Sequence, residues 1–298
     1  MRYYNSIILI LGSLLVILCT SGIIRHDISE SKYLELANQK QFDCVGQVFI
    51  GSDTIVGGSC VLINKNYVLS AAHVFMESES ITDSSLMNQG VITFDQINDH
   101  VYPASRITIV INGQKMSAKS ITIHPVYLDS LTEGNCDLAL IELEESVTNT
   151  LPAKLNYSYS EINADVVGVG FGATGPADRP DKVTSQNIKI AGENVIDSIG
   201  GYSYGGNETK LICDFDHPNR NDCNKMGSPI PKALEYITSG GDSGGALFIK
   251  EGKLWKLVGI CSGSGIQLEQ FMKSFYYGQV MEWTRVSAFT GWIESNMK

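Results

Sequence analysis

Residues 237–248, ITSGGDSGGALF, set a serine among glycines directly before an apolar segment. Glycine lets the backbone turn tightly, and a short apolar run after a turn is typical of a β-strand. A serine hydroxyl is a poor nucleophile at neutral pH unless a base removes its proton and donors face the developing oxyanion. The stretch therefore predicts a turn between strands, and the rest of the chain must decide whether Ser243 is a nucleophile.

Short apolar segments separated by Gly, Asn and Ser make up most of the chain around this turn. They begin at residues 45, 57, 67, 106, 120, 137, 165, 245, 254 and 278. Roughly a dozen strands without long helices between them predict an all-β sandwich or a pair of barrels. We expect a helix at the end of the chain, because apolar residues there have helical spacing. Two polar stretches, 76–106 and about 192–235, are interpreted as surface loops.

The composition describes a globular protein with ample material for a core. Of the 298 residues, 43% are hydrophobic, 18% are charged and 29 are glycine. The length allows one large domain or two of ordinary size. The formal net charge of −10 argues against a nucleic-acid partner, because no basic surface is left to neutralise phosphates.

The N-terminal residues 1–22 combine a basic residue, an apolar run over 7–18 and a small-residue end. The run is shorter than the ~20 residues of a membrane span. It predicts a secretory signal peptide cut near Ser21 or Gly22, with an uncleaved anchor or a lipidated Cys19 as alternatives. We therefore expect a secreted or periplasmic protein that leaves the membrane when the signal peptide is removed.

Export would leave six cysteines, at positions 44, 60, 136, 213, 223 and 261. This even number permits up to three disulfide bonds in an oxidising compartment. Cys213 and Cys223 are close in sequence and are predicted to close a loop. The other four are candidates for disulfides or for buried free thiols.

Three short motifs stand in the order His, Asp, Ser along the chain. VLSAAHV contains His73, NCDLALIEL contains Asp137 and GGDSGGAL contains Ser243. In such a set the serine attacks, the imidazole takes and returns the proton, and the carboxylate fixes the imidazole tautomer and stabilises its cation. Each motif alone has an ordinary structural explanation, but their conjunction favours a catalytic set.

With these motifs the chain resembles the trypsin–chymotrypsin family of serine endopeptidases, from about Val45 to the C-terminal helix. The resemblance implies an all-β fold of two six-stranded antiparallel barrels with the site in the cleft between them. Barrel one would span about 45–150, barrel two about 155–286 and the terminal helix about 287–297.

The same resemblance assigns the roles of general base, orienting carboxylate and nucleophile to His73, Asp137 and Ser243, respectively. The backbone N–H groups of Gly241 and Ser243 would form the oxyanion hole. Asp242 matches a buried aspartate that pairs with a new α-amino group after activation. Ser262 matches a serine whose strand lines the substrate cleft.

The specificity pocket departs from the family pattern. Ile237 stands where trypsin-like members have an aspartate, so a bound Lys or Arg side chain would lack a counter-charge. Ser239 replaces a cysteine that usually braces this pocket. We expect a neutral apolar P1 side chain, with Ser264 or Gly265 on one wall, and a small or medium one if Met281 points inward from the other.

Other departures concern the first barrel and the start of the active chain. Val56 and Val74 occupy the places of a usual disulfide, so apolar packing is expected there. IVGG at 55–58 is rejected as an activation site, because a cut there would remove part of the fold. Residues 23–44 form an N-terminal segment or a short propeptide, with a start near Tyr33 or no activation cut as the two alternatives.

The resemblance implies protein or peptide substrates, allows protein inhibitors, and goes with a monomer. No cofactor is expected. Calcium is the minor alternative, on the loosely spaced carboxylates of the first polar stretch, Glu77, Glu79, Asp83, Asp95 and Asp99. His124 is interpreted as structural.

Two rival classes were weighed against the endopeptidase. GDSGG also fits the nucleophile elbow of α/β-hydrolases, which need an acid and a histidine after the serine. No His or Asp follows Ser243, so that class is excluded. A non-catalytic binding protein of the same fold stays the alternative, although such proteins typically lose a catalytic residue and all three are present here.

Overall fold

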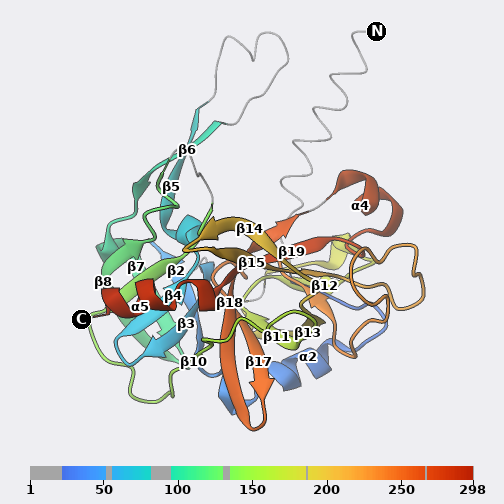
Figure 1. Cartoon of the computed structure of the whole chain (residues 1–298), viewed down its shortest axis with the longest axis horizontal. Coiled ribbons are helices and arrows are strands. Elements are labelled where there is room, and N and C mark those ends of the chain that lie inside the picture. Colours follow the sequence, from blue (N-terminus) through green and yellow to red (C-terminus); the bar gives the residue numbers. More distant parts are fainter. Residues whose placement is uncertain are drawn as a thin grey trace.

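The computed structural model describes residues 22–51, 56–81, 95–129, 135–185, 187–265 and 267–297, which form two β units in contact (Figure 1). The largest buried cluster takes side chains from both units, among them Val61 and Ile109 of the first and Phe248 and Ile260 of the second. The two units therefore share one apolar core. No helix in the described ranges is long and apolar enough to cross a membrane.

The first unit is a closed six-stranded barrel. Its strands follow the order β2 (Val45–Ile50), β3 (Val56–Asn64), β4 (Tyr67–Ser70), β9 (Ala139–Leu143), β8 (Gln114–Ile123) and β7 (Ile107–Ile111). Antiparallel pairing of β7 with β2 closes it. In β7 the isoleucines at 107, 109 and 111 are buried and alternate with less buried residues, as expected for a strand with one face in a core. The predicted first barrel is thus observed.

The first polar stretch, predicted as a loop, contains two paired strands. β5 (Met76–Ile81) and β6 (Asp95–Val101) form a separate two-stranded antiparallel sheet. A 3₁₀ turn, η3 (Ala104–Arg106), leads from it back into the barrel. The loop interpretation is therefore wrong for these residues.

The second unit is an eight-stranded sheet. Its path runs β13 (Ile190–Val195), β11 (Asp165–Gly170), β17 (Ala246–Glu251), β18 (Leu254–Gly265), β19 (Val280–Arg285), β15 (Asn207–Asp214) and β14 (Ser198–Tyr204), with β10 (Lys154–Leu155) pairing parallel to β18. It ends at β13 and β14 and is not a closed six-stranded barrel, unlike the prediction. A side chain bridges part of the opening, because Asn194 Nδ2 donates to the carbonyl oxygens of Asp214, at 2.9 Å, and Tyr236, at 3.3 Å.

The N-terminal segment forms a third, three-stranded sheet. β1 (Gly22–Ile24) pairs parallel with β12 (Thr174–Pro176) and antiparallel with β16 (Tyr236–Ile237). Ile23 is fully buried there. Tyr33 lies buried in α2 (Glu30–Ala37), where its hydroxyl donates to Glu235 O at 3.0 Å. A chain beginning at Tyr33 would lose β1, so the structure argues against that start.

Two short helices lie near the end of the chain. α4 (Leu268–Ser274) precedes β19, and α5 (Thr290–Asn296) lies within the range where the terminal helix was predicted. α5 packs on the first barrel, since the ring of His124 lies 5.0 Å from those of both Phe289 and Trp292 (Figure 1). The remaining 3₁₀ turns are η1 (Lys40–Phe42), η2 (Ala72–Phe75), η4 (Pro180–Lys182) and η5 (Val286–Ala288).

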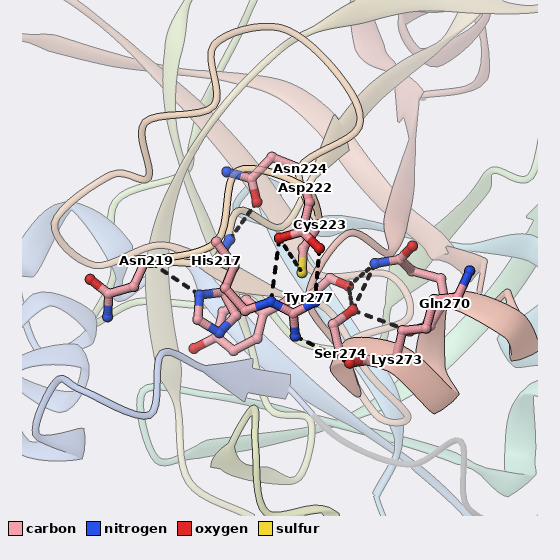
Figure 2. Close-up of polar contacts among 10 residues, drawn as sticks. His217, Asn219, Asp222, Cys223, Asn224, Gln270, Lys273, Ser274 and Tyr277 are labelled. Carbon is pink, nitrogen blue, oxygen red and sulfur yellow. Dashed lines mark hydrogen bonds and ion pairs between the residues drawn. The ribbon is translucent and has the colours of Figure 1, made fainter.

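The second polar stretch was also predicted as a loop, and it contains β14 and β15. Its remainder, 215–235, is hydrogen-bonded to α4 and within itself (Figure 2). The Arg220 Nη1 group donates to Lys273 O at 3.2 Å, and the peptide N–H of His217 donates to Asn224 Oδ1 at 2.7 Å. These contacts hold the connection between β15 and β16 in a fixed path.

The six cysteines in the described residues are buried free thiols. The predicted Cys213–Cys223 disulfide is therefore wrong. Cys213 lies on β15 opposite Met281, inside the second core. Cys223 belongs to the same buried cluster, and its backbone lies against the turn before β19, where a Cβ on Gly278 would lie 2.0 Å from the Cys223 carbonyl oxygen. Burial raises the pKa of the Cys213 thiol well above its ordinary value.

Candidate functional site

His73 lies in η2, directly after β4, with its neighbour Ala72 fully buried. Its imidazole Nδ1 is 2.7 Å from Asp137 Oδ2, and its peptide N–H donates to Asp137 Oδ1 at 3.0 Å. This two-point attachment fixes the ring. If Nδ1 carries the proton of the neutral imidazole, Nε2 is left free to accept one.

Asp137 is buried in front of β9, and both β units supply its partners. Ser262 of β18 donates its hydroxyl to Asp137 Oδ2 at 2.7 Å, and Thr284 of β19 donates to the Asp137 carbonyl at 2.9 Å. Burial raises the pKa of Asp137, but the His73 charge and hydrogen bonds from His73 and Ser262 lower it more, so the net pKa lies below the ordinary value.

The pKa of His73 is set by the same pair. Burial lowers it, while the charge and hydrogen bond of Asp137 raise it more, so the net pKa is above the ordinary value. The pair therefore favours a negative carboxylate beside an imidazole that readily accepts a second proton.

Ser243 lies in a turn of the second unit that docks on the first barrel. Its carbonyl accepts the Ser59 N–H at 2.7 Å, and the Ser59 hydroxyl donates to Gly241 O at 2.8 Å. A Cβ on Gly58 would lie 2.9 Å from both Ser243 O and a methyl of Val74. Since Val74 follows His73, the turn places Ser243 beside the imidazole-bearing segment.

Glycines are required on both sides of Ser243. Gly241 and Gly244 have φ of +96° and +83°, which side chains disfavour. A Cβ on Gly244 would also lie 2.1 Å from the Ser70 hydroxyl. In the described part of the chain, no acceptor lies on the backbone N–H of Gly241 or Ser243, so both donors are available to a ligand.

Asp242 is 3% exposed and its carboxylate sits in a cradle of glycines. A Cβ on Gly22, Gly170 or Gly172 would lie 2.8, 2.2 or 2.5 Å from one of its oxygens. The backbone N–H groups of Gly172 and Ser239 donate to it at 2.8 and 3.0 Å. Burial outweighs these two bonds and raises its pKa to about 7. Among the described residues, no cation pairs with this carboxylate to hold it ionised.

Three of the residues predicted for the specificity pocket, Ile237, Ser264 and Met281, lie in the second unit. Ile237 and Met281 are 1% and 0% exposed, and both lie in the second apolar core. Ser264 is half-buried on β18, opposite Met281 in the strand register. Met281 is thus packed inside the second unit, and the predicted floor position is held by the apolar side chain of Ile237.

The two valines that replace the usual disulfide differ in environment. Val74 is buried in the shared core, whereas Val56 is half-exposed at the start of β3. Val74 packs against Gly58.

His124 is fully buried among aromatic rings, and this burial lowers its pKa to about 4. His124 thus lies among packed side chains of the first barrel and α5, outside the His73–Asp137 pair.

No metal-binding group of His, Cys, Asp or Glu occurs within the residues the structure describes. Of the carboxylates weighed for calcium, Glu77 faces Arg106 at 3.4 Å. Asp83 and the side chains of the other three lie outside the described residues.

Three residues of the site were missed by sequence reasoning. Ser59 docks the serine turn, Thr284 anchors Asp137, and Gly22 contacts Asp242. Each acts across a long sequence separation, and only the small residues at 57–59 gave a local hint of close packing.

Fold and site together define a mostly-β protein of the trypsin fold class, with a His–Asp pair on a closed barrel and a serine turn docked beside it. A family model described as Trypsin matches residues 35–293. The chain belongs to the trypsin family. Members of this family are generally serine endopeptidases that act on proteins and peptides.

Proposed function

We propose that this protein is a serine endopeptidase that hydrolyses peptide bonds through an acyl-enzyme on Ser243. The observation that carries the proposal is the 2.7 Å contact between His73 Nδ1 and the buried Asp137 carboxylate, beside the docked serine turn. A buried ionised carboxylate is what an imidazolium needs during proton transfer.

In the acylation step the Ser243 oxygen attacks the substrate carbonyl carbon, and its proton passes to His73 Nε2. The N–H groups of Gly241 and Ser243 stabilise the oxyanion. The C–N bond then breaks, and the leaving amine takes the proton from His73. Water attacks the ester in the same way, which releases the acid and restores the serine.

The substrate class follows from the pocket residues. With Ile237 at the floor, a P1 Lys or Arg would bury its charge without a partner, which disfavours cleavage after basic residues. If Met281 narrows the pocket from its other wall, the P1 side chain is small or medium, neutral and apolar. We also propose that residues 1–22 are a signal peptide and that the enzyme is secreted or periplasmic.

The test combines an active-site probe with substrate profiling. A fluorophosphonate should add once to the exported protein and not to Ser243→Ala, while Ser160→Ala, an exposed serine elsewhere, should react as the parent does. A peptide panel should show cleavage after small apolar residues. Equal labelling of Ser243→Ala would overturn the catalytic assignment, and preferred cleavage after Arg would overturn the pocket assignment alone.

A further inference from the structure

A groove of about 940 Å³ opens where the β3–β4 turn, residues 151–155 and the β17–β18 hairpin converge. Figure 1 shows β10 and the β17–β18 hairpin at the bottom of the view. Ile63, Leu155 and Trp255 are among its lining residues. No residue of the candidate catalytic site lines it.

Large apolar side chains stay exposed around this groove. Leu151, Leu254 and Tyr157 are 89%, 60% and 57% exposed, and all three line it. Single exposed apolar residues are ordinary, but several gathered in one concave place mark a binding surface. Covering these side chains would remove apolar surface from water, which favours binding.

The charges of the groove have one sign. Lys40, Lys65, Lys154 and Lys253 reach it from four separate segments, and no Asp or Glu among the described residues lines it. In the described part of the chain none of these four lysines forms an ion pair. Two acids near the groove have partners of their own, since Glu251 forms an ion pair with Lys256 and Glu294 accepts the hydroxyl of the lining residue Tyr157.

This local excess is unusual in a chain with 32 acidic and 22 basic residues. An acidic ligand is repelled by most of the surface and attracted here. A single carboxylate would neutralise one lysine. Four lysines from separate segments are complementary to several negative charges spread along a ligand. The exposed apolar residues are complementary to apolar side chains placed between those charges.

We propose that this lysine groove binds an acidic peptide segment of a partner protein, in which Asp or Glu alternates with large apolar residues. Apolar side chains of the segment contact Leu151, Leu254 and Trp255, while its carboxylates meet the four lysines. The groove is thus a second binding surface, separate from peptide-bond hydrolysis.

The probe is a fluorescein-labelled peptide of alternating Glu and Leu, added to Ser243→Ala protein so that it is not cut. Anisotropy should show saturable binding that weakens with salt. Adding Lys65→Glu and Lys253→Glu together should weaken it at least about tenfold. The control pair Lys115→Glu and Lys182→Glu changes the net charge equally outside the groove and should leave the Kd within about twofold.

A peptide with Lys in place of Glu should not bind, and thermal melting checks that each variant is folded. Three results overturn the proposal: no saturable binding, equal weakening in both lysine pairs, or binding of anionic lipid vesicles without binding of the peptide. Hydrolysis of a small peptide substrate by the same lysine variants, with Ser243 intact, should match the parent, so this test is separate from that of the catalytic assignment.

Discussion

At the scale of single residues, the ionisation of His73 depends on one neighbour. Burial acts to lower its pKa, and Asp137 raises it above the ordinary value by charge and hydrogen bond. Only the neutral imidazole can accept the serine proton. We therefore expect kcat/KM to fall as the pH drops through a midpoint above about 6.5.

Removing the Asp137 charge should reverse the change in the pKa of His73. In Asp137→Asn only the effect of burial remains, so the pKa of His73 should drop below about 6.5 and activity should fall by orders of magnitude. NMR titration of the imidazole measures this without turnover, with His124 as the internal control. An unchanged His73 titration would contradict the coupling.

Ser262 acts on the catalytic pair through Asp137, to whose Oδ2 it donates. A hydrogen bond to a charged partner contributes about 1.5–3 kcal/mol, so Ser262→Ala should lower kcat/KM about 10- to 150-fold. Ser120→Ala removes an exposed serine bond to Glu142 and is the matched control. If both variants behave alike, Ser262 has no positioning role.

At the scale of elements, the strand β1 determines the surroundings of Asp242, which the sequence did not predict. It places Gly22 against Asp242, whose buried carboxylate has two backbone donors and, within the described ranges, no cation. A chain beginning at Ile23 would put an α-ammonium group beside that oxygen. Such a chain should hydrolyse peptides far faster than one retaining Ser21 and Gly22, because the buried ion pair is worth about 3–5 kcal/mol against an unpaired carboxylate.

A double-mutant comparison separates this contact from general damage. Asp242→Asn should strongly reduce activity in the chain beginning at Ile23 and change it little in the chain retaining Gly22. Acetylating the Ile23 amine should imitate the retained residues. Equal activity of the two starting points would show that Asp242 needs no amino group.

The same element shows what sequence could and could not predict. The first barrel and the three motif residues were predictable because each depends on a local pattern. β1 was not, because its strand character comes from pairing with β12 and β16 far along the chain. The bridge that Asn194 makes across the open second sheet, and the free state of Cys213, depend on contacts between residues far apart in the sequence.

At the scale of the whole molecule, four carboxyls lie close together around the end of β15 and the connection that follows it. They are Asp197, Asp214, Asp216 and Glu235. Burial, followed by the charges of Asp214 and Asp197, raises the pKa of Asp216 to about 8. Burial likewise raises that of Glu235 to about 8. Asp216 is 5% exposed, and its Oδ1 has no hydrogen-bond partner in the described residues.

These raised pKa values make stability depend on pH. An unfolded carboxyl ionises near pH 4, so between about pH 4 and 8 the folded state holds protons that the unfolded state has released. The contribution of these carboxyls to the free energy of unfolding therefore falls as the pH rises through this range and levels off above it. Asp216→Asn removes one such group. Each tenfold weakening of the carboxylic acid on folding lowers the free energy of unfolding by about 1.4 kcal/mol at a pH where the unfolded carboxyl is ionised.

At pH 8 we expect the Tm of Asp216→Asn to exceed that of the parent by about 2–4 °C for each kcal/mol of unfolding free energy gained. Near pH 4 the two Tm values should be equal. Differential scanning calorimetry at both pH values measures the difference. Glu145→Gln, an exposed carboxyl, should follow the parent throughout. A constant offset at both pH values would assign the effect to packing, and equal melting of variant and parent at pH 8 would show that folding does not raise the pKa of Asp216.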